Sequence, residues 1–278
     1  MSGNTGSVDK KLLSFVMLAS LLTVTLLIYE PLPLSPANSQ TLSCTTYLYQ
    51  PNVPQDTQRV VCLVFDDGWL NQYTNALPVL DEYGFKAAFN IITAYPNKVP
   101  EYMSWNQIQT LYNQGHVIGS HTVDHSTLDT LDTTSVEYQL SKSKRDLLEH
   151  GINTPLFVYP EGKGADDLNI ENLVQQQYCI ARSINHAPLN MSLSFNPYSL
   201  PAYSIEKSTT LDLFTLYVNQ ASGSTIVILY YHHVGAGSAD TSVTTEDFAA
   251  QMQYLHDNNF TIQTLNQLFT SVVVNENV

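Results

Sequence analysis

The chain has 278 residues, enough for one large α/β domain or two small ones. Apolar residues make up 44% and charged residues only 13%, so the chain can bury a sizeable core beneath a sparsely charged surface. With 25 acidic and 11 basic side chains the net charge is −14, which argues against nucleic acid and anionic membranes as partners. Neutral or cationic ligands, sugars among them, fit such a surface.

The N-terminal segment, residues 1–30, has the layout of a secretory signal. Two lysines precede an apolar run at residues 12–28, and residues 31–57 are rich in Pro, Ser, Thr, Asn and Gln. The run is short for a spanning helix, but an uncleaved membrane anchor stays an alternative. We therefore expect the folded part to lie outside the cytoplasm, secreted or anchored to the cell surface, with residues 31–57 as a linker or extended arm.

The three cysteines are Cys44, Cys62 and Cys179. An odd number without paired spacing predicts neither a disulfide framework nor a cysteine zinc site. Cys62 and Cys179 fall in expected strands, where we expect them to be core residues.

Strand and helix patterns alternate about seven times after residue 58. The expected strands are apolar runs between turn residues, at 60–65, 85–92, 116–119, 155–159, 178–183, 224–231 and 261–263. The expected helices carry apolar residues at helical spacing, at 71–83, 105–112, 134–150, 167–177, 210–220, 246–258 and from 265 onward. The alternation predicts one α/β domain, about residues 58–274, with a parallel sheet that is closed as a barrel or left open.

The first expected strand ends in two adjacent carboxylates. Val60–Phe65 is apolar throughout, as in a strand buried on both faces, and Asp66, Asp67 and Gly68 follow it directly. Two acids at the mouth of a buried strand repel each other and lose hydration, and a bound cation is the simplest group to offset that cost. The alternative is a solvated turn with an aspartate at a helix N-cap.

Polar residues follow the other expected strands in the same way. In chain order they are His121 and His125, Pro160–Gly162, Arg182, and His232 with His233. In a (β/α) barrel the C-terminal ends of the strands share one face, where active sites are built. In an open sheet the same residues would spread along an edge and converge less well.

His121 and His125 are four residues apart, so both imidazoles would lie on one side of a helical turn. With one carboxylate from Asp66 and Asp67 they form a His₂Asp ligand set that suits Zn²⁺ and leaves a fourth position for water. The second carboxylate would then be free to take a proton from that water. The alternative is a solvated helix N-terminus that binds no metal.

Four motifs thus follow one another: Phe65–Gly68, His121-Thr-Val-Asp-His125, Tyr159-Pro160-x-Gly162 and the strand that ends in His232. In order and spacing they resemble the motifs of the polysaccharide deacetylases, the NodB-homology domain of carbohydrate esterase family 4. The resemblance covers about residues 58–272. It implies an α/β fold, a distorted (β/α) barrel of about seven parallel strands, with a divalent metal that we expect to be Zn²⁺.

The resemblance also assigns roles to the matching residues. The metal ligands would be Asp67, His121 and His125. Asp66 would be the general base, and His232 the general acid that protonates the departing amine. The backbone N–H of Glu161 would help to hold the tetrahedral oxyanion. The implied activity is removal of N-acetyl groups from a GlcNAc-type polysaccharide or oligosaccharide, with release of acetate.

The chain departs from the family pattern at several points. Val158 stands where the family often has an arginine that orients the base, and we expect Arg182 on the next strand to take that role. Glu161 replaces a common aromatic residue, so substrate contacts are expected to differ. We find no clear match to the family's Asp/Trp motif before the last strand. Side chains alternate along a strand, so only one of His232 and His233 is expected to face the barrel axis, and motif position favours His232.

Several aromatic residues and one proline are expected to line the sugar site: Trp69, Tyr73, Tyr159, Pro160 and Tyr231. Packing beneath loops is the alternative for each aromatic residue. Two other functions stay open. One is an amide hydrolase of the same superfold that acts on a small non-sugar substrate. The other is a catalytically silent glycan-binding surface protein, against which the full set of acids and histidines argues.

Overall fold

The computed structural model describes residues 47–51, 58–235 and 239–273. These ranges belong to the unit Gln40–Val278. The segment expected to be a signal or anchor, and most of the expected linker, lie outside the described residues. None of the helices in the described ranges combines the length and apolar character needed to cross a bilayer.

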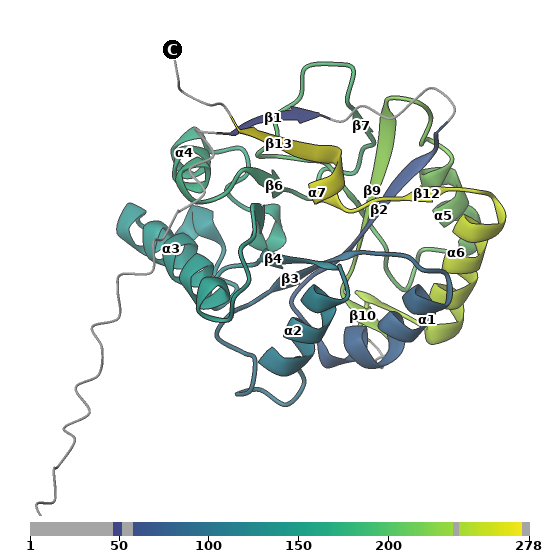
Figure 1. The fold of residues 1–278 in the computed structure, drawn as a ribbon, viewed down its shortest axis with the longest axis horizontal. Helices are drawn as coiled ribbons and strands as arrows, with labels where there is room; N and C mark the ends of the chain where they lie inside the picture. Colours follow the sequence, from purple (N-terminus) through teal and green to yellow (C-terminus); the bar gives the residue numbers. More distant parts are fainter. Residues whose placement is uncertain (1–46, 52–57, 236–238, 274–278) are drawn as a thin grey trace, which may run out of the picture. The chain divides into compact units, whose positions relative to one another are not determined.

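A strongly curled, mostly parallel sheet occupies the centre of this unit, with β2 and β9 in its middle (Figure 1). Its strands run in the order β6-β5-β4-β3-β2-β9-β7, with β12 beside β2 and β8 beside β9. The strands are β2 Val60–Phe65, β3 Ala88–Ile91, β4 Val117–Ser120, β5 Leu156–Val158, β6 Ile180–Arg182, β7 Leu189–Asn190, β8 Tyr203–Ser204, β9 Thr225–Tyr231 and β12 Thr261–Ile262. Every described pair in this sheet is parallel except β7 with β9.

The two flanks of the sheet are joined by residues 200–204. Leu200 forms a parallel bridge with Arg182 at the end of β6, and β8 pairs with β9, placing Tyr203 opposite Leu229. Among the described strands, β2, β3, β4, β5, β6, β8 and β9 therefore follow one another around a ring. This confirms the expected distorted barrel, in which the C-terminal strand ends face one side.

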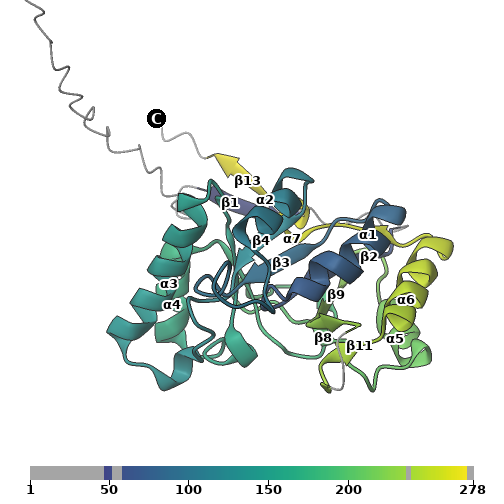
Figure 2. The same cartoon turned by 90° about the horizontal axis from the view of Figure 1, so that it is seen from below.

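Helices surround the sheet in both views (Figures 1 and 2). They are a π-helix at Gln72–Ala76, α1 Leu77–Glu82, α2 Trp105–Asn113, α3 Thr133–Glu149, α4 Leu168–Gln177, α5 Leu211–Val218, α6 Thr245–Asp257 and α7 Leu265–Leu268, with short 3₁₀ turns at Leu128–Thr130 and Pro160–Gly162. Most lie within two residues of the expected positions. The first is the exception, because the expected single helix begins with a π-helical turn.

Polar caps explain where the longer helices begin. Ser104 accepts the N–H of Gln107, and the Gln107 side chain accepts the N–H of Ser104, which is a capping box at the start of α2. The side chains of Asp132, Thr210 and Thr244 cap α3, α5 and α6 by accepting N–H groups of the first turn. These starts were predictable because the cap residues are local in sequence.

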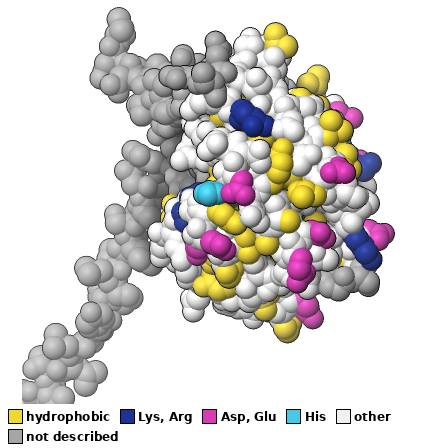
Figure 3. Space-filling view, turned by 90° about the vertical axis from the view of Figure 1, so that its right-hand side faces the viewer, with side chains coloured by type: hydrophobic (Ala, Val, Ile, Leu, Met, Phe, Trp, Pro, Cys, Tyr) yellow, Lys and Arg dark blue, Asp and Glu magenta, His cyan; other side chains and the backbone are white. Residues whose placement is uncertain are grey.

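Alternation along the strands separates an outer core from an inner core. In β2, Val61 and Leu63 belong to a cluster beneath the helices, whereas Cys62 and Val64 belong to the cluster inside the curl of the sheet. Both rows are buried, which is why the strand is apolar throughout. At the surface, charged side chains are sparse and interspersed with hydrophobic and neutral ones on the face shown in Figure 3.

Two short strand pairs were not predicted. β10 His233–Val234 pairs in parallel with β11 Ser242–Val243, and β1 Tyr47–Pro51 pairs antiparallel with β13 Phe269–Val273. β1 lies inside the stretch expected to be a linker or extended arm, so part of that arm runs along the C-terminal strand (Figure 1).

Cys62 and Cys179 are both buried, as expected, but the disulfide of one of them was not predicted. Cys62 is free, whereas Cys179 is disulfide-bonded. Spacing along the chain could not show this, because a disulfide depends on which distant segments folding brings together.

His116 gives the fold a measurable pH dependence. It is buried, its Nδ1 accepts the N–H of Ala87 at 3.2 Å, and burial with the nearby Lys86 lowers its pKa from 6.5 to about 4. Above pH 6.5 neither the folded nor the unfolded chain protonates this ring. As the pH falls from 6.5 to about 4, only the unfolded chain takes up the proton, so the folded state loses roughly 2–3 kcal/mol of stability.

We expect His116→Asn, which keeps an acceptor oxygen and does not titrate, to lose less stability than wild type on acidification. Urea unfolding at about pH 7 and about pH 4.5 measures the difference. His256→Asn, at an exposed histidine, serves as control. Equal acid-induced losses in wild type and His116→Asn would contradict the assignment.

Candidate metal centre and active site

The inward rows of β2 and β9 continue into polar residues beyond the strands. In β2 the inward row passes through Val64 to Asp66, and in β9 it passes through Tyr230 to His232. The strands are neighbours, and the N–H of Asp66 donates to the carbonyl of Tyr231 at 2.9 Å. Pairing in the sheet therefore brings the expected base and the expected acid to the same end of the barrel.

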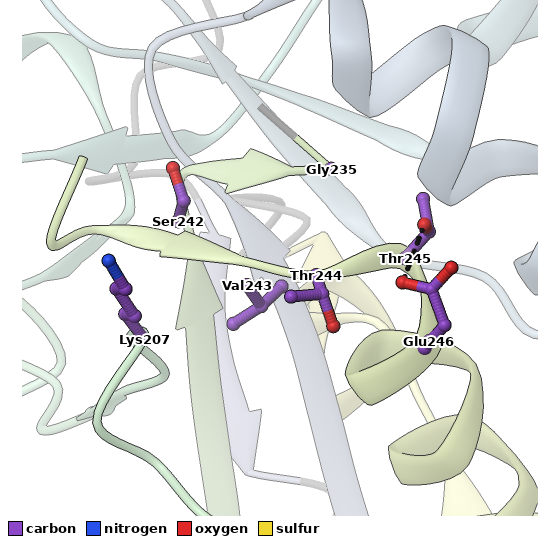
Figure 4. A pocket seen from close by; sticks show the side chains of 7 residues that line it. All are labelled: Lys207, Gly235, Ser242, Val243, Thr244, Thr245 and Glu246. Carbon is purple, nitrogen blue, oxygen red and sulfur yellow. Dashed lines mark hydrogen bonds between the residues drawn. The ribbon is translucent and has the colours of Figure 1, made fainter. Parts of the chain in front are cut away.

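These strand ends surround a pocket of about 540 Å³. Its lining includes Asp66, Asp67, Trp69, His121, His125, Glu161, His232 and His233. The pocket therefore holds the expected metal ligands together with the expected base and acid. Another hollow, of about 230 Å³, is lined by Lys207, Gly235, β11 and the first residues of α6, and Lys207 and Glu246 lie at its two sides (Figure 4). Among the described residues, the cluster that could hold a metal ion lies in the pocket of about 540 Å³.

Asp67, His121 and His125 form that cluster, with one ligand atom from each within 4.8 Å of the others. The Nε2 atoms of both histidines lie 3.4 Å from Oδ1 of Asp67. This buried oxygen has no hydrogen-bond partner among the described residues, which is costly unless a cation compensates it. A carboxylate and two imidazoles are donors that divalent transition metals accept, so the trio fits a divalent metal site.

Hydrogen bonds to the other polar atoms of these side chains orient the ligand atoms toward one another. Nδ1 of His121 lies 2.8 Å from the carbonyl of Val158, which leaves Nε2 free to bind. The indole N–H of Trp69 donates to Oδ2 of Asp67 at 2.8 Å and leaves Oδ1 for the histidines. Burial alone would raise the pKa of Asp67, but the neighbouring histidines lower it well below its usual range, so this carboxylate is ionised.

The segment from His121 to His125 is not the helical turn that the four-residue spacing suggested. Thr122 and His125 have φ values of 66° and 67°, in the left-handed region that non-glycine residues rarely adopt. The hydroxyl of Thr122 accepts the N–H of His125 at 3.0 Å. From α3, Gln139 accepts the N–H of Val123 at 2.9 Å. The two imidazoles are therefore brought together by left-handed backbone at Thr122 and His125, in a loop that Gln139 holds from α3, and not by helical periodicity.

Both oxygens of Asp66 are held by side chains. Asn90 donates to Oδ1 at 2.9 Å, and the fully buried Arg182 contacts Oδ2 while its guanidinium lies over the Tyr230 ring at 4.4 Å. Burial alone would raise the pKa of Asp66, but Arg182, with His121 and His232, outweighs it and lowers the pKa. The Arg182–Asp66 contact foreseen from the empty position at Val158 is present, and its role in orienting the base stays a prediction.

Sequence reasoning missed Asn90. The signal was available, because Asn90 is the one polar residue of the otherwise apolar β3 (Ala-Phe-Asn-Ile) and shares the inward row with Ala88. Gly119 on β4 makes room for it, since a Cβ at that position would lie 2.1 Å from Oδ1 of Asn90.

Both histidines that end β9 line the pocket, although one was expected to point away. His232 lies in the bend between β9 and β10, where the alternation of a strand no longer applies. Its buried Nδ1 has no hydrogen-bond partner in the described part of the chain. His233 packs against the Trp69 ring at 4.2 Å, and its Nδ1 lies 3.0 Å from the amide nitrogen of Asn71.

The expected substrate contacts are only partly placed at the pocket. Trp69 lines it, but Tyr231 is fully buried in the outer core, where its hydroxyl donates to Gln251 at 3.0 Å, and Tyr230 takes the inward position instead. The prediction for Tyr231 was therefore wrong by one residue, which in a strand reverses the face. Tyr159 borders the pocket but is 1% exposed, its ring packed against Phe157.

The turn at Pro160–Gly162 forms part of the rim. Pro160 is buried and is not among the lining residues, whereas the exposed Glu161 borders the pocket with φ of 54°. The N–H groups of Gly162 and Lys163 bond to carbonyls within this turn. The role expected for the N–H of Glu161 stays a prediction. Tyr73 is partly buried and packs against the outer core, away from the pocket lining.

Comparison with known proteins agrees with this geometry. Residues 54–178 match the family model described as polysaccharide deacetylase, and this range includes Asp67, His121 and His125. Residues 54–178 therefore belong to the polysaccharide deacetylase family. The matched range ends before Arg182 and His232, whose placement comes from the structure.

The two sequence relatives described below match half of this chain or less, and the matches span well under half of each relative's own length. A gellan lyase from a Bacillus species is 34% identical over 150 residues, 50% of this chain and 6% of that protein. A peptidoglycan-N-acetylglucosamine deacetylase from Bacillus cereus is 31% identical over 101 residues, 36% of this chain and 35% of that protein. The solved Bc1960 peptidoglycan N-acetylglucosamine deacetylase has a TM-score of 0.57 at 16% identity and covers 80% of this chain and 92% of its own, which shows a shared fold.

We expect Asp67→Ala and His125→Ala to reduce bound divalent metal to a small fraction of the wild-type amount, because each removes one of three ligands. Metal analysis after dialysis against Zn²⁺ and extensive washing measures this. His256→Ala, at an exposed histidine outside the pocket, serves as control. Wild-type metal content in both ligand variants would show that the trio does not hold the ion.

Proposed function

We propose that this protein is a metal-dependent N-deacetylase that hydrolyses the N-acetyl groups of a GlcNAc-type glycan and releases acetate. The observation that carries the proposal is the joint placement of the Asp67–His121–His125 trio, the ionised Asp66 and His232 in one pocket. Hydrolysis of an amide needs a base for water, stabilisation of an oxyanion and an acid for the nitrogen, and these residues supply that set.

A divalent ion held by the trio, for which Zn²⁺ is our choice, would polarise the acetyl carbonyl and make water easier to deprotonate. Asp66 takes one proton from the attacking water as its oxygen bonds to the carbonyl carbon. The backbone N–H of Glu161 faces the charge that develops on the carbonyl oxygen. His232 gives a proton to the nitrogen as the C–N bond breaks, so the products are acetate and a free amine.

The placement of Asp66 suits the role of base. A carboxylate whose two oxygens are held by Asn90 and Arg182 is fixed in direction, and its lowered pKa keeps it ionised at neutral pH. A fixed, ionised acceptor needs no reorganisation before it takes a proton.

Several observations support a glycan outside the cytoplasm as the substrate. Trp69 offers an aromatic face at the pocket, the chain is sparsely charged, and one of the relatives named above is a peptidoglycan-N-acetylglucosamine deacetylase. Disulfides persist in oxidising compartments, so the disulfide at Cys179 supports a secreted or surface-attached protein.

The proposal predicts chelator-sensitive release of acetate from N-acetylglucosamine oligomers. Enzymatic acetate measurement should give a rate that falls to background after chelation and returns on addition of Zn²⁺, since the metal is required for the chemistry. Acetate release from small acetamides but from no glycan would favour an amide hydrolase with another substrate. Glycan binding without acetate release by metal-loaded protein would favour a silent binding protein.

Arg182 should affect the rate of hydrolysis through its contact with Asp66. We expect Arg182→Met to lower kcat/KM by about 10–100-fold and to move the acidic limb of the rate profile to higher pH, because the group that most strongly opposes the effect of burial on the pKa of Asp66 is then removed. Arg182→Lys, which keeps the charge, should retain more activity and a profile nearer wild type. Arg145→Met, at an exposed arginine, is the control, and unchanged activity and pH profile in Arg182→Met would refute the role.

A further inference from the structure

The chain between the Asp66–Asp67 pair and α1 reaches across the pocket end of the barrel to the His232 segment. It ends with the π-helical turn Gln72–Ala76, a rare conformation that is frequent at functional sites. Three amide side chains in or beside this turn, Asn71, Gln72 and Asn75, hydrogen-bond to residues 232–234. We call these three side chains the amide clamp.

Gln72 joins the expected base to the expected acid through their backbones. It is fully buried, and its amide nitrogen donates to the carbonyl of Asp66 at 2.5 Å and to the carbonyl of His232 at 2.8 Å. Its own oxygen has no hydrogen-bond partner among the described residues. Leaving a buried amide oxygen unpaired costs stability that an apolar side chain of similar size would avoid, so the two donated bonds are the reason for an amide here.

Asn71 and Asn75 hold the next residues of the same segment. Asn71 donates to Nδ1 of His233 at 3.0 Å and accepts the N–H of Val234 at 3.1 Å. Asn75 donates to the carbonyl of Val234 at 2.7 Å. Gly235 allows this approach, because a Cβ at that position would lie 2.8 Å from the amide nitrogen of Asn75.

The clamp also reaches the metal cluster. The His233 ring, held by Asn71, packs against Trp69, and the Trp69 indole donates to Oδ2 of Asp67. No hydrogen bond holds Nδ1 of His232 within the described ranges, and its ring meets the Tyr230 ring edge-on at 5.7 Å, so its position depends largely on its backbone. It also lies beyond β9, where sheet pairing no longer holds it.

We propose that the amide clamp is the positioning device that sets His232 relative to Asp66 for proton transfer. This rests on the proposed function of the same pocket. Gln72 sets the distance between the backbones of Asp66 and His232. Asn71 and Asn75 fix the direction of residues 232–234, the segment that carries His232. All three are positioning residues, since they act through backbone carbonyls, a backbone N–H and His233.

The kinetic test is Gln72→Met, which keeps the length of the side chain and removes both donated bonds. Because a misplacement of about 1 Å can cost about 100-fold in rate, we expect kcat to fall about 10–100-fold with KM within about threefold of wild type and metal content unchanged. The matched control is Gln251→Met, at another fully buried glutamine, whose side chain accepts from the Tyr231 hydroxyl in the outer core. We expect wild-type kcat there.

A structural readout separates this inference from the proposed function. In ¹H–¹⁵N spectra of the histidine imidazoles, recorded on metal-loaded protein, Gln72→Met should shift or broaden the His232 and His233 signals and leave His256 unchanged. If wild type releases no acetate but these signals change, the proposed function fails and the clamp stands. Unchanged signals with unchanged kcat overturn the clamp, as does a loss of kcat of equal size in Gln251→Met. If Gln72→Met does not fold, Asn75→Ala is read by the same criteria.

Discussion

The burial of two neighbouring carboxylates at the mouth of β2 is the constraint on which the rest of the structure depends. Asp66 and Asp67 are both largely withdrawn from water, so each needs compensation. Asp66 receives it from Arg182 and Asn90, and Asp67 from Trp69 and from two imidazoles that together can hold a cation. The two acids therefore have different surroundings, which fit the roles proposed above, with Asp66 as a proton acceptor and Asp67 as a metal ligand.

The curl of the sheet makes this compensation available. Side chains on the inward row of a parallel sheet converge only if the sheet bends around them, and here β3, β6 and β9 all deliver polar groups toward Asp66. The segment at residues 200–204 keeps the bend by bridging β6 and β9. Behind the site, the π-helical turn supplies amides where the chain beyond β9 leaves the support of the sheet.

Local features were largely predictable from the sequence, and long-range ones were not. Apolar runs, helix caps and the Asp-Asp-Gly and His-x₃-His motifs each consist of residues close together in the sequence. They predicted the correct fold and the Asp67–His121–His125 cluster. The error at Tyr231 concerned the face and not the end of the strand, because β9 ends at Tyr231 as expected but Tyr230 is the residue of the inward row. The left-handed residues around His121 and the disulfide at Cys179 depend on groups distant in the chain, which no local pattern encodes. The lone polar residue of β3 marked Asn90 as unusual, but its partner Asp66 could be named only from the fold.

The pairing of β2 has a consequence for how the chain matures. The central strand lies near residue 60, but two of its parallel partners, β9 and β12, come from residues 225–231 and 261–262. During synthesis β2 can pair early with β3, but its edge toward β9 stays unpaired until most of the polypeptide has left the ribosome. The wall of the pocket that His232 and His233 form is therefore added late, so truncated or half-folded copies would have an incomplete pocket.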